Sequence, residues 1–415
     1  MVPKGWSSSQ LGEIMSFKNG LNFTKTDNGD SVKIVGVGDF KDLSELSSTE
    51  HLELINVAGR IRDEELLNNG DLLFVRSNGN KDLIGRCMFF PEVRERLSFS
   101  GFTIRGRVIN ESTLPAYMAI VARSSQFQMQ ISKASGGTNI SNLSQQILND
   151  INLLLPPLIE QKKIAEILST WDKAISVTEK LLTNSQQQKK ALMQQLLTGK
   201  KRLLDENGVR FSTEWEFKRI SEIATRVQRK NDAAEHPILT ISSLSGFVRQ
   251  DERYSRYMAG ESVKNYILLK KGEFAYNKGN SKTYEFGCIF DLEAYEAGLV
   301  PHVYVCFRLK NGLSHRYFKY LFEADYLKPQ LGALVNTGVR NNGLLNIKPT
   351  EFMQTKVPVP CFEEQESIAD MLYNSSRTIR VLQDKLACLK DEKKALMQQL
   401  LTGKRRVKVD EAVAV

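Results

Sequence analysis

One twelve-residue string occurs twice in this 415-residue sequence, and this repeat constrains the fold more than any other feature. KKALMQQLLTGK runs from Lys189 to Lys200 and again, 204 positions later, from Lys393 to Lys404. The same offset holds upstream without a gap. The matching pairs are Pro156 and Pro360, Glu160-Gln161 and Glu364-Gln365, and Ile164-Ala165 and Ile368-Ala369. A repeat of this length within one chain indicates two halves with the same architecture.

Each half closes with a segment typical of a strand, then prolines, then one long helix. Apolar residues recur at heptad spacing over about 38 residues, which is typical of a helix that pairs with another helix. Thr198-Gly199 and Thr402-Gly403 supply a glycine stop. An amphipathic helix packed on its own domain is the alternative, but about 38 residues exceed what one globular core needs. We therefore predict that the two long helices pair as a coiled coil. Its predicted spacer core comprises Ile164, Leu168, Trp171, Ile175, Leu182, Leu192, Leu196, Ile368, Leu372, Ile379, Leu382, Leu386, Leu389, Leu396 and Leu400.

The segments that precede the two helices also correspond, although their sequences have diverged. Trp6 and Trp215 open the two segments, and the strand that begins at Gly70 resembles the one that begins at Gly272, each entering a polar loop. We predict two α/β (α+β) domains, each with a twisted sheet, related by a pseudo-twofold internal repeat. The predicted bounds are 1–155 for the first domain, 156–204 for the first helix region, 205–357 for the second domain, 358–406 for the second helix region and 407–415 for a C-terminal tail.

Composition narrows the class of partner and the compartment. The formal net charge is +9 and the sequence pI is about 9.1, which suits a polyanionic partner. Five cysteines without paired spacing favour reduced thiols. The first residues contain no apolar signal region, and no stretch reaches the roughly 18 apolar residues of a membrane span. We expect a cytoplasmic protein.

The whole layout resembles the specificity subunits of Type I restriction-modification systems. The motifs that carry the resemblance are LPPLIEQKKIAEIL with ALMQQLLTGKKR, and VPVPCFEEQESIADML with ALMQQLLTGKRR. The second copy has Cys361-Phe362-Glu363 where the first has Pro157-Leu158-Ile159. The resemblance implies two target-recognition domains that each recognise one half of an interrupted DNA sequence, and two long helices that pair as an antiparallel coiled coil between them. It also implies two modification subunits that hold the methyl donor and methylate adenine N6, and restriction subunits that act as ATP-driven motor and nuclease.

The predicted helix length is consistent with a spacer between two DNA-binding domains. A helix of about 38 residues is about 57 Å long, and B-DNA advances about 3.4 Å per base pair. Two domains held that far apart would meet the duplex about one and a half turns apart. Since the domains differ in sequence, we expect an asymmetric, bipartite site in double-stranded DNA.

The sequence gives no reason to expect a catalytic centre, a metal or a bound cofactor. The only Pro-Pro pair, Pro156-Pro157, lies between leucines and lacks the polar residue and aromatic of an adenine methyltransferase loop. Gly36-Val37-Gly38 lacks the third glycine of a dinucleotide fingerprint, and Gly199-Lys200 ends a helix where a phosphate loop would begin one. The four histidines make no metal spacing with cysteine.

Polar, glycine-flanked loops are the best candidates for contacts with bases and phosphates, because arginine and lysine suit guanine and phosphate whereas asparagine suits adenine. The predicted DNA-binding residues are Arg76, Ser77, Asn78, Asn80, Lys81, Lys133, Thr138, Asn139 and Ser141 in the first domain, and Arg226, Arg229, Lys230, Asn277, Lys278, Asn280, Lys282, Asn336, Thr337, Arg340, Asn341 and Asn342 in the second. Ordinary solvated loops are the alternative for each of them.

Surface residues of the helices recur as faithfully as core residues, which predicts a repeated docking partner. The predicted docking residues are Gln194, Gln195, Gln398 and Gln399. A solvated helix face is the alternative. Two other functions compete with DNA recognition: a coiled-coil scaffold protein that does not bind DNA, and a self-contained DNA-modifying enzyme.

Overall fold

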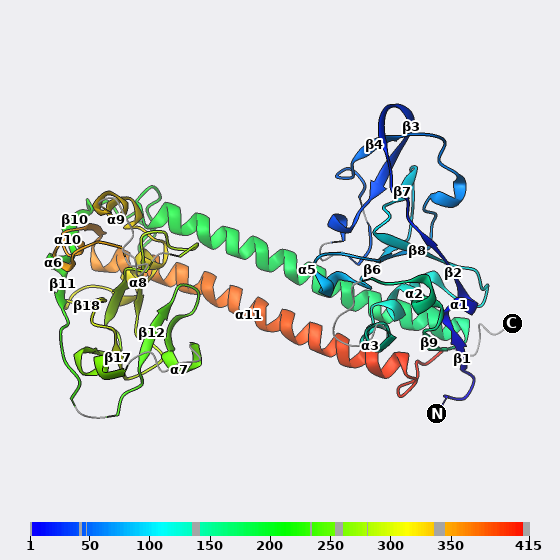
Figure 1. The fold of residues 1–415 in the computed structure, drawn as a ribbon. Coiled ribbons are helices and arrows are strands. Elements are labelled where there is room, and N and C mark those ends of the chain that lie inside the picture. The colour runs from blue at the N-terminus through cyan, green and yellow to red at the C-terminus, as the bar shows by residue number, and fades with distance from the viewer. Residues whose placement is uncertain are drawn as a thin grey trace. The chain divides into compact units, whose positions relative to one another are not determined.

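The computed structural model describes residues 2–40, 44–46, 48–134, 142–232, 235–253, 260–279, 281–335 and 345–409 (Figure 1). The chain divides into two units. Unit 1 contains residues 1–179 and 385–415, and unit 2 contains residues 180–384. Each unit takes one part of both long helices, α5 (Leu158–Leu196) and α11 (Phe362–Leu401). Both helices begin and end inside the predicted helix regions, while the predicted domain bounds stay a prediction.

Unit 1 is built on a four-stranded antiparallel sheet in the order β2-β8-β5-β6. Its strands are β2 (Met15–Asn19), β8 (Thr103–Val108), β5 (Asp71–Val75) and β6 (Cys87–Phe90). The central strand β5 is buried along its whole length, as expected for a run of apolar residues covered on both faces. A second sheet has the order β4-β3-β7, with β4 (Leu54–Val57), β3 (Lys25–Val35) and β7 (Leu97–Phe99).

Short helices and an outer strand pair complete unit 1. The strands β1 (Ser7–Gln10) and β9 (Asn152–Leu155) pair antiparallel ahead of α5. The helices are α1 (Leu11–Ile14), α2 (Pro115–Ala122), α3 (Ser125–Ala134) and α4 (Gln145–Asn149), with 3-10 turns at Val37–Asp39, Asp63–Glu65 and Lys81–Leu83. Tyr117 of α2 and Phe74 of β5 are fully buried in one core that also receives Leu400 from α11.

Unit 2 repeats this plan with different side chains. Its four-stranded sheet has the order β11-β18-β15-β16, with β11 (Ala224–Arg226), β18 (Val305–Leu309), β15 (Phe274–Asn277) and β16 (Cys288–Asp291). Three strand pairs surround it: β10 (Glu216–Arg219) with β19 (Lys356–Val359), β12 (Leu239–Ser242) with β13 (Gly246–Arg249), and β14 (Ile267–Lys270) with β17 (Ala297–Val300). The helices are α6 (Ile220–Ile223), α7 (Gln250–Arg253), α8 (His315–Glu323), α9 (Lys328–Leu334) and α10 (Pro349–Phe352), with a 3-10 helix at Gly260–Asn265.

The long helices run in opposite directions where they meet within unit 1. Lys390 of α11 forms an ion pair with Glu179 of α5 over 2.7 Å, and Lys393 pairs with Asp172. Arg406, beyond the end of α11, pairs with Glu160 in the first turn of α5. Residue numbers in α11 rise as those in α5 fall, so the two segments are antiparallel in this unit.

Unit 2 shows the reciprocal arrangement. Leu196, near the end of α5, shares a core with Ile368 and Leu372 near the start of α11. Each helix ends at a glycine in the left-handed region, Gly199 at φ +70° and Gly403 at φ +65°. A Cβ atom on Gly403 would lie 2.4 Å from Pro3 Cγ, so this glycine is needed for close approach as well as for its φ angle.

Candidate nucleic-acid interface

The loop after β5 is held in shape by its own asparagines. The Asn78 Oδ1 atom accepts a hydrogen bond from the Asn80 amide over 2.8 Å, and the Asn80 Oδ1 atom accepts one from the Asp82 amide over 3.1 Å. Such local bonds fix a turn without help from the rest of the fold. The loop residues nearest the sheet, Arg76, Ser77 and Asn78, are half-buried, and Asn80 and Lys81 are exposed. The loop therefore has a fixed backbone conformation and presents part of its side chains to solvent.

The two loops predicted for the first domain meet at one backbone contact. The Leu143 amide donates to the Arg76 carbonyl over 2.7 Å. Leu143 is fully buried and immediately follows the segment that contains Thr138, Asn139 and Ser141, which lie outside the described residues. Lys133 is exposed near the end of α3. The structure thus joins the end of the second loop to the start of the first.

The second domain repeats this junction. The Leu345 amide donates to the Lys278 carbonyl over 3.1 Å, and the Asn277 Oδ1 atom accepts from the Gly279 amide over 2.9 Å. Asn277 and Lys278 are half-buried and Lys282 is exposed. The predicted residues that fall outside the described part of the chain are Asn280, Asn336, Thr337, Arg340, Asn341 and Asn342. The same backbone contact between segments far apart in sequence therefore occurs in both units.

The three basic residues of TRVQRKN do not share one environment. The Arg229 guanidinium pairs with the buried Glu273 over 2.7 Å and donates to the Leu268 carbonyl over 3.0 Å. The hydrogen bond to Glu273 raises the Arg229 pKa. Arg226 is half-buried on β11, and Lys230 is exposed. Lys230 is thus the most accessible of the three for a phosphate, whereas Arg229 also stabilises the sheet.

One exposed aromatic next to the first loop was not predicted from the sequence. Phe102 is 60% exposed in the turn between β7 and β8. Its carbonyl accepts hydrogen bonds from the amides of Arg76 (2.8 Å) and Ser77 (3.3 Å), and the Arg76 guanidinium donates to the Gly101 carbonyl over 3.4 Å. The turn and the loop are therefore one structural piece. The sequence pattern around Phe102 indicates only a strand, so it gave no sign of this exposure.

The repeated Glu-Gln pair forms a buried junction in each unit. In unit 2, Glu364 is fully buried and accepts hydrogen bonds from Arg202 Nε (2.6 Å), Arg202 Nη2 (2.7 Å) and Trp215 Nε1 (2.8 Å). The Arg202 guanidinium also lies 5.5 Å from the centre of the Trp215 ring. In unit 1, Glu160 has the same two kinds of partner, Arg406 and Trp6, at the ends of the described chain. The motif thus ties the start of one helix to the end of the other.

The glutamines of the same pair serve the backbone. The Gln161 side chain accepts from the Leu114 amide over 2.8 Å and donates to the Ser112 and Pro156 carbonyls. Gln365 accepts from the Ser314 amide over 2.9 Å and donates to the Pro360 carbonyl. Each glutamine therefore fixes the loop before α2 or α8 to the start of a long helix, which explains why the pair recurs. The motif was recognised in the sequence, but its role was not.

The predicted spacer-core residues are all buried or half-buried. Those that are buried are Ile164, Leu168, Leu196, Ile368, Leu372 and Leu400; those that are half-buried are Trp171, Ile175, Leu182, Leu192, Ile379, Leu382, Leu386, Leu389 and Leu396. The predicted docking residues Gln194, Gln195, Gln398 and Gln399 are all exposed. The six buried residues belong to the hydrophobic cores of the two units, so their burial reflects the packing of the helix ends within each unit, and the spacer-core and docking assignments stay predictions.

Three of the cysteines, Cys87, Cys288 and Cys306, are buried. Burial raises the pKa of the Cys87, Cys288 and Cys306 thiols to about 12, which disfavours the thiolate needed for nucleophilic chemistry at neutral pH. Among the described residues, no group of three or more His, Cys, Asp or Glu side chains is placed to hold a metal ion. Within the same residues, no helix is long and apolar enough to span a membrane.

Sequence comparisons match this chain to a DNA specificity domain and to several specificity subunits. Residues 3–184 match the family model of the Type I restriction modification DNA specificity domain. Over 98% of its length, the chain is 25% identical to 95% of a putative type I restriction enzyme MjaX specificity subunit of Methanocaldococcus jannaschii. It is 24% identical to the EcoKI specificity subunit of Escherichia coli K12, over 88% of this chain and 81% of that one. The match to the M. jannaschii MjaVIII specificity subunit is 27% identical and spans 66% of each chain.

Solved structures share the fold across the whole chain. A chain from a type I R-M system, studied for complex assembly and conformational transition, has a TM-score of 0.58 at 16% identity, covering 98% of this chain and 100% of that one. The S subunit from M. genitalium has a TM-score of 0.54 at 12% identity, covering 95% and 96%. The family resemblance seen in the sequence is confirmed: residues 3–184 match the DNA specificity domain, and relatives that span most of the chain are Type I restriction enzyme specificity subunits, which supports sequence-specific DNA recognition.

Proposed function

We propose that this chain recognises an asymmetric, bipartite DNA site, with one half of the site bound by each unit. The observation that carries the proposal is the duplicated junction between the loop after the central strand and the segment ahead of β9 or β19, at Leu143–Arg76 and Leu345–Lys278. The loop residues at these junctions differ between the units, so two different half-sites are expected.

The candidate DNA-binding residues are those predicted from the sequence, and Phe102 is added to them. Arginine and lysine side chains on a loop can contact guanine edges and phosphates, and asparagine amides can contact adenine. The net charge of +9 favours a polyanion. Phe102 offers an apolar surface for a thymine methyl group or an unstacked base step.

The paired helices are proposed to act as a coiled-coil spacer and as the docking platform for partner subunits. Antiparallel contacts within each unit support the pairing. The exposed glutamine pairs, identical in both copies, support two docking positions, one for each of two modification subunits. Methylation and cleavage are assigned to modification and restriction subunits, and this chain is proposed to be non-catalytic, to bind no cofactor and to act in the cytoplasm.

DNA binding by the purified chain over a range of salt concentrations tests the proposal. Neutralising Z phosphates gives a slope of log K against log salt of about −0.9Z, so several phosphate contacts predict a steep, linear decrease in affinity. A specific oligonucleotide should retain higher affinity than a scrambled one at every salt concentration. Binding that is weak, flat with salt and equal for both oligonucleotides would instead favour a scaffold protein.

A further inference from the structure

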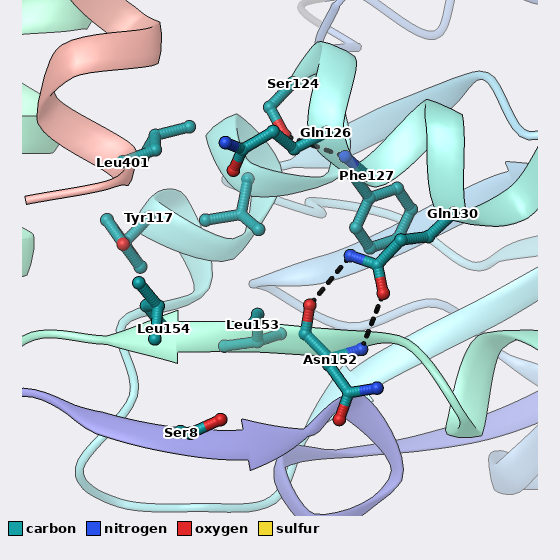
Figure 2. A pocket seen from close by; sticks show the side chains of 11 residues that line it. Ser8, Tyr117, Ser124, Gln126, Phe127, Gln130, Asn152, Leu153, Leu154 and Leu401 are labelled. Atoms are coloured by element: carbon teal, nitrogen blue, oxygen red, sulfur yellow. Dashed lines mark hydrogen bonds between the residues drawn. The ribbon is translucent and has the colours of Figure 1, made fainter. Parts of the chain in front are cut away.

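A groove in unit 1 lies between the α2–α3 corner and the last turns of α11. Its volume is about 440 Å³, and its lining includes the apolar side chains of Ile175, Met397 and Leu401. A neighbouring pocket, drawn in Figure 2, shares Ser124, Gln126 and Leu401 with it. Figure 2 shows Leu401 on the same side of that pocket as Tyr117, with Gln126 opposite. The groove can therefore accept an apolar side chain.

Basic side chains line the open edge of this groove. Lys390 and Lys393 belong to its lining, but each already has a carboxylate partner on α5. Arg123 and Lys394 also line it, and within the part of the chain that the structure describes neither has an ion-pair partner. Arg123 only donates Nε to the Ala119 carbonyl over 2.9 Å. Two positive charges thus face the groove without a carboxylate.

The internal repeat shows what kind of group fits there. Tyr117 and Tyr317 are fully buried counterparts, as are Ile131 and Leu331, so Arg123 corresponds to Glu323. In unit 2, Glu323 pairs with Lys189, which is the counterpart of Lys393 in the repeated string. A carboxylate therefore occupies this position in unit 2, and an arginine replaces it in unit 1.

We propose that the unit 1 groove binds an acidic, amphipathic segment of a protein partner, and that unit 2 has no equivalent site. The partner's carboxylates would pair with Arg123 and Lys394, and its apolar side chains would cover Ile175, Met397 and Leu401. DNA could also place phosphates beside these basic residues, but the apolar lining of the groove favours a peptide over a sugar-phosphate backbone. The partner is the modification subunit that docks on unit 1, which rests on the proposed function.

Charge reversal in the full-length chain tests the inference. The R123E/K394E variant should bind the purified modification subunit about tenfold more weakly at low salt, with a smaller difference at high salt, because rim charges act through screened electrostatics. The matched K190E variant changes the counterpart of Lys394 on α5 and should change the affinity less than twofold. DNA affinity of the R123E/K394E chain alone should also stay within twofold. An equal loss in K190E, no loss in R123E/K394E, or a parallel loss of DNA affinity would overturn the proposal.

A photo-crosslinker provides a second, independent result. Gln398 lines the groove and is exposed, so a photoreactive residue placed there should crosslink to a peptide rich in Asp and Glu in the purified complex. Crosslinks only to neutral or basic peptides would contradict the inference. If the wild-type chain does not bind the modification subunit at all, the proposed function itself fails, a result distinct from a failure of the groove.

Discussion

The Arg202–Glu364–Trp215 junction of unit 2 should stabilise the folded chain more than the Arg406–Glu160–Trp6 junction of unit 1 does. Glu364 is fully buried with three hydrogen bonds of 2.6–2.8 Å, and the Arg202 side chain is 21% exposed. Removing one partner of a buried pair costs about 3–5 kcal/mol because the other charge is left uncompensated. Since water can reach Arg202 partly, the lower end applies, and E364A should lose about 3 kcal/mol.

The matched substitution in unit 1 should cost less. The Arg406 side chain is 42% exposed, and the Trp6 Nε1 atom lies 3.4 Å from Glu160. Greater solvation of the arginine and a longer bond predict a loss of about 1–2 kcal/mol for E160A. The exposed neighbour Glu363 serves as the control, and E363A should lose less than about 0.5 kcal/mol.

Urea unfolding followed by tryptophan fluorescence measures these differences, because Trp215 and Trp6 report directly on the two junctions. E364A should destabilise the chain most, E160A less, and E363A least. If E364A proves no more destabilising than E363A, the junction does not hold the helix ends together and the reasoning fails.

Substitutions at Gly287, Asp325 and Phe102 should each have a measurable effect. G287A should lower the free energy of unfolding by about 2 kcal/mol or more, because Gly287 has φ +86° and an added Cβ would clash with the Asn277 carbonyl oxygen. G272A is the control: Gly272 has φ +80° but open space around it, so the loss should be about 1 kcal/mol in the same thermal unfolding assay. Burial raises the pKa of Asp325 to about 6, so the folded state binds this proton more tightly than the unfolded chain does. The free energy of unfolding should therefore fall as pH rises from about 4 to about 6. D325N should be more stable than the wild type by up to about 1 kcal/mol at pH 7 and show no gain below pH 4. F102A should weaken specific DNA binding by about tenfold, whereas L54A, at a position 63% exposed in the same domain, should leave it unchanged in an equilibrium binding titration.

The repeated segments could be predicted well from the sequence, because heptad spacing, a glycine stop and a fixed offset report directly on long helices. All fifteen predicted spacer-core residues are at least half-buried, and the four predicted docking glutamines are exposed. The roles of Glu364 and Gln365 could not be predicted in the same way. Their partners, such as Trp215 and Ser314, are brought to them by tertiary contacts that no local pattern encodes.

The candidate site shows the same limit. Glycine-flanked polar loops marked Arg76 and Lys278 as candidates, but the pairing of each loop with a distant segment appears only in the fold. The Arg229 side chain is of the kind that contacts phosphate, yet it forms an ion pair with the buried carboxylate of Glu273. Phe102 lies in an apolar stretch that reads as strand, and only the turn between β7 and β8 exposes it.

The most direct test of the central claim is methylome sequencing of cells that express this chain with its modification subunit. Because residues 385–415 are part of unit 1, point variants are better probes than truncations. We predict an interrupted, asymmetric motif with N6-methyladenine in both halves for the wild type. R76A should relax one half of that motif only, and K278A the other half only. A continuous or palindromic motif, or a change in both halves from either variant, would contradict recognition of one half-site by each domain.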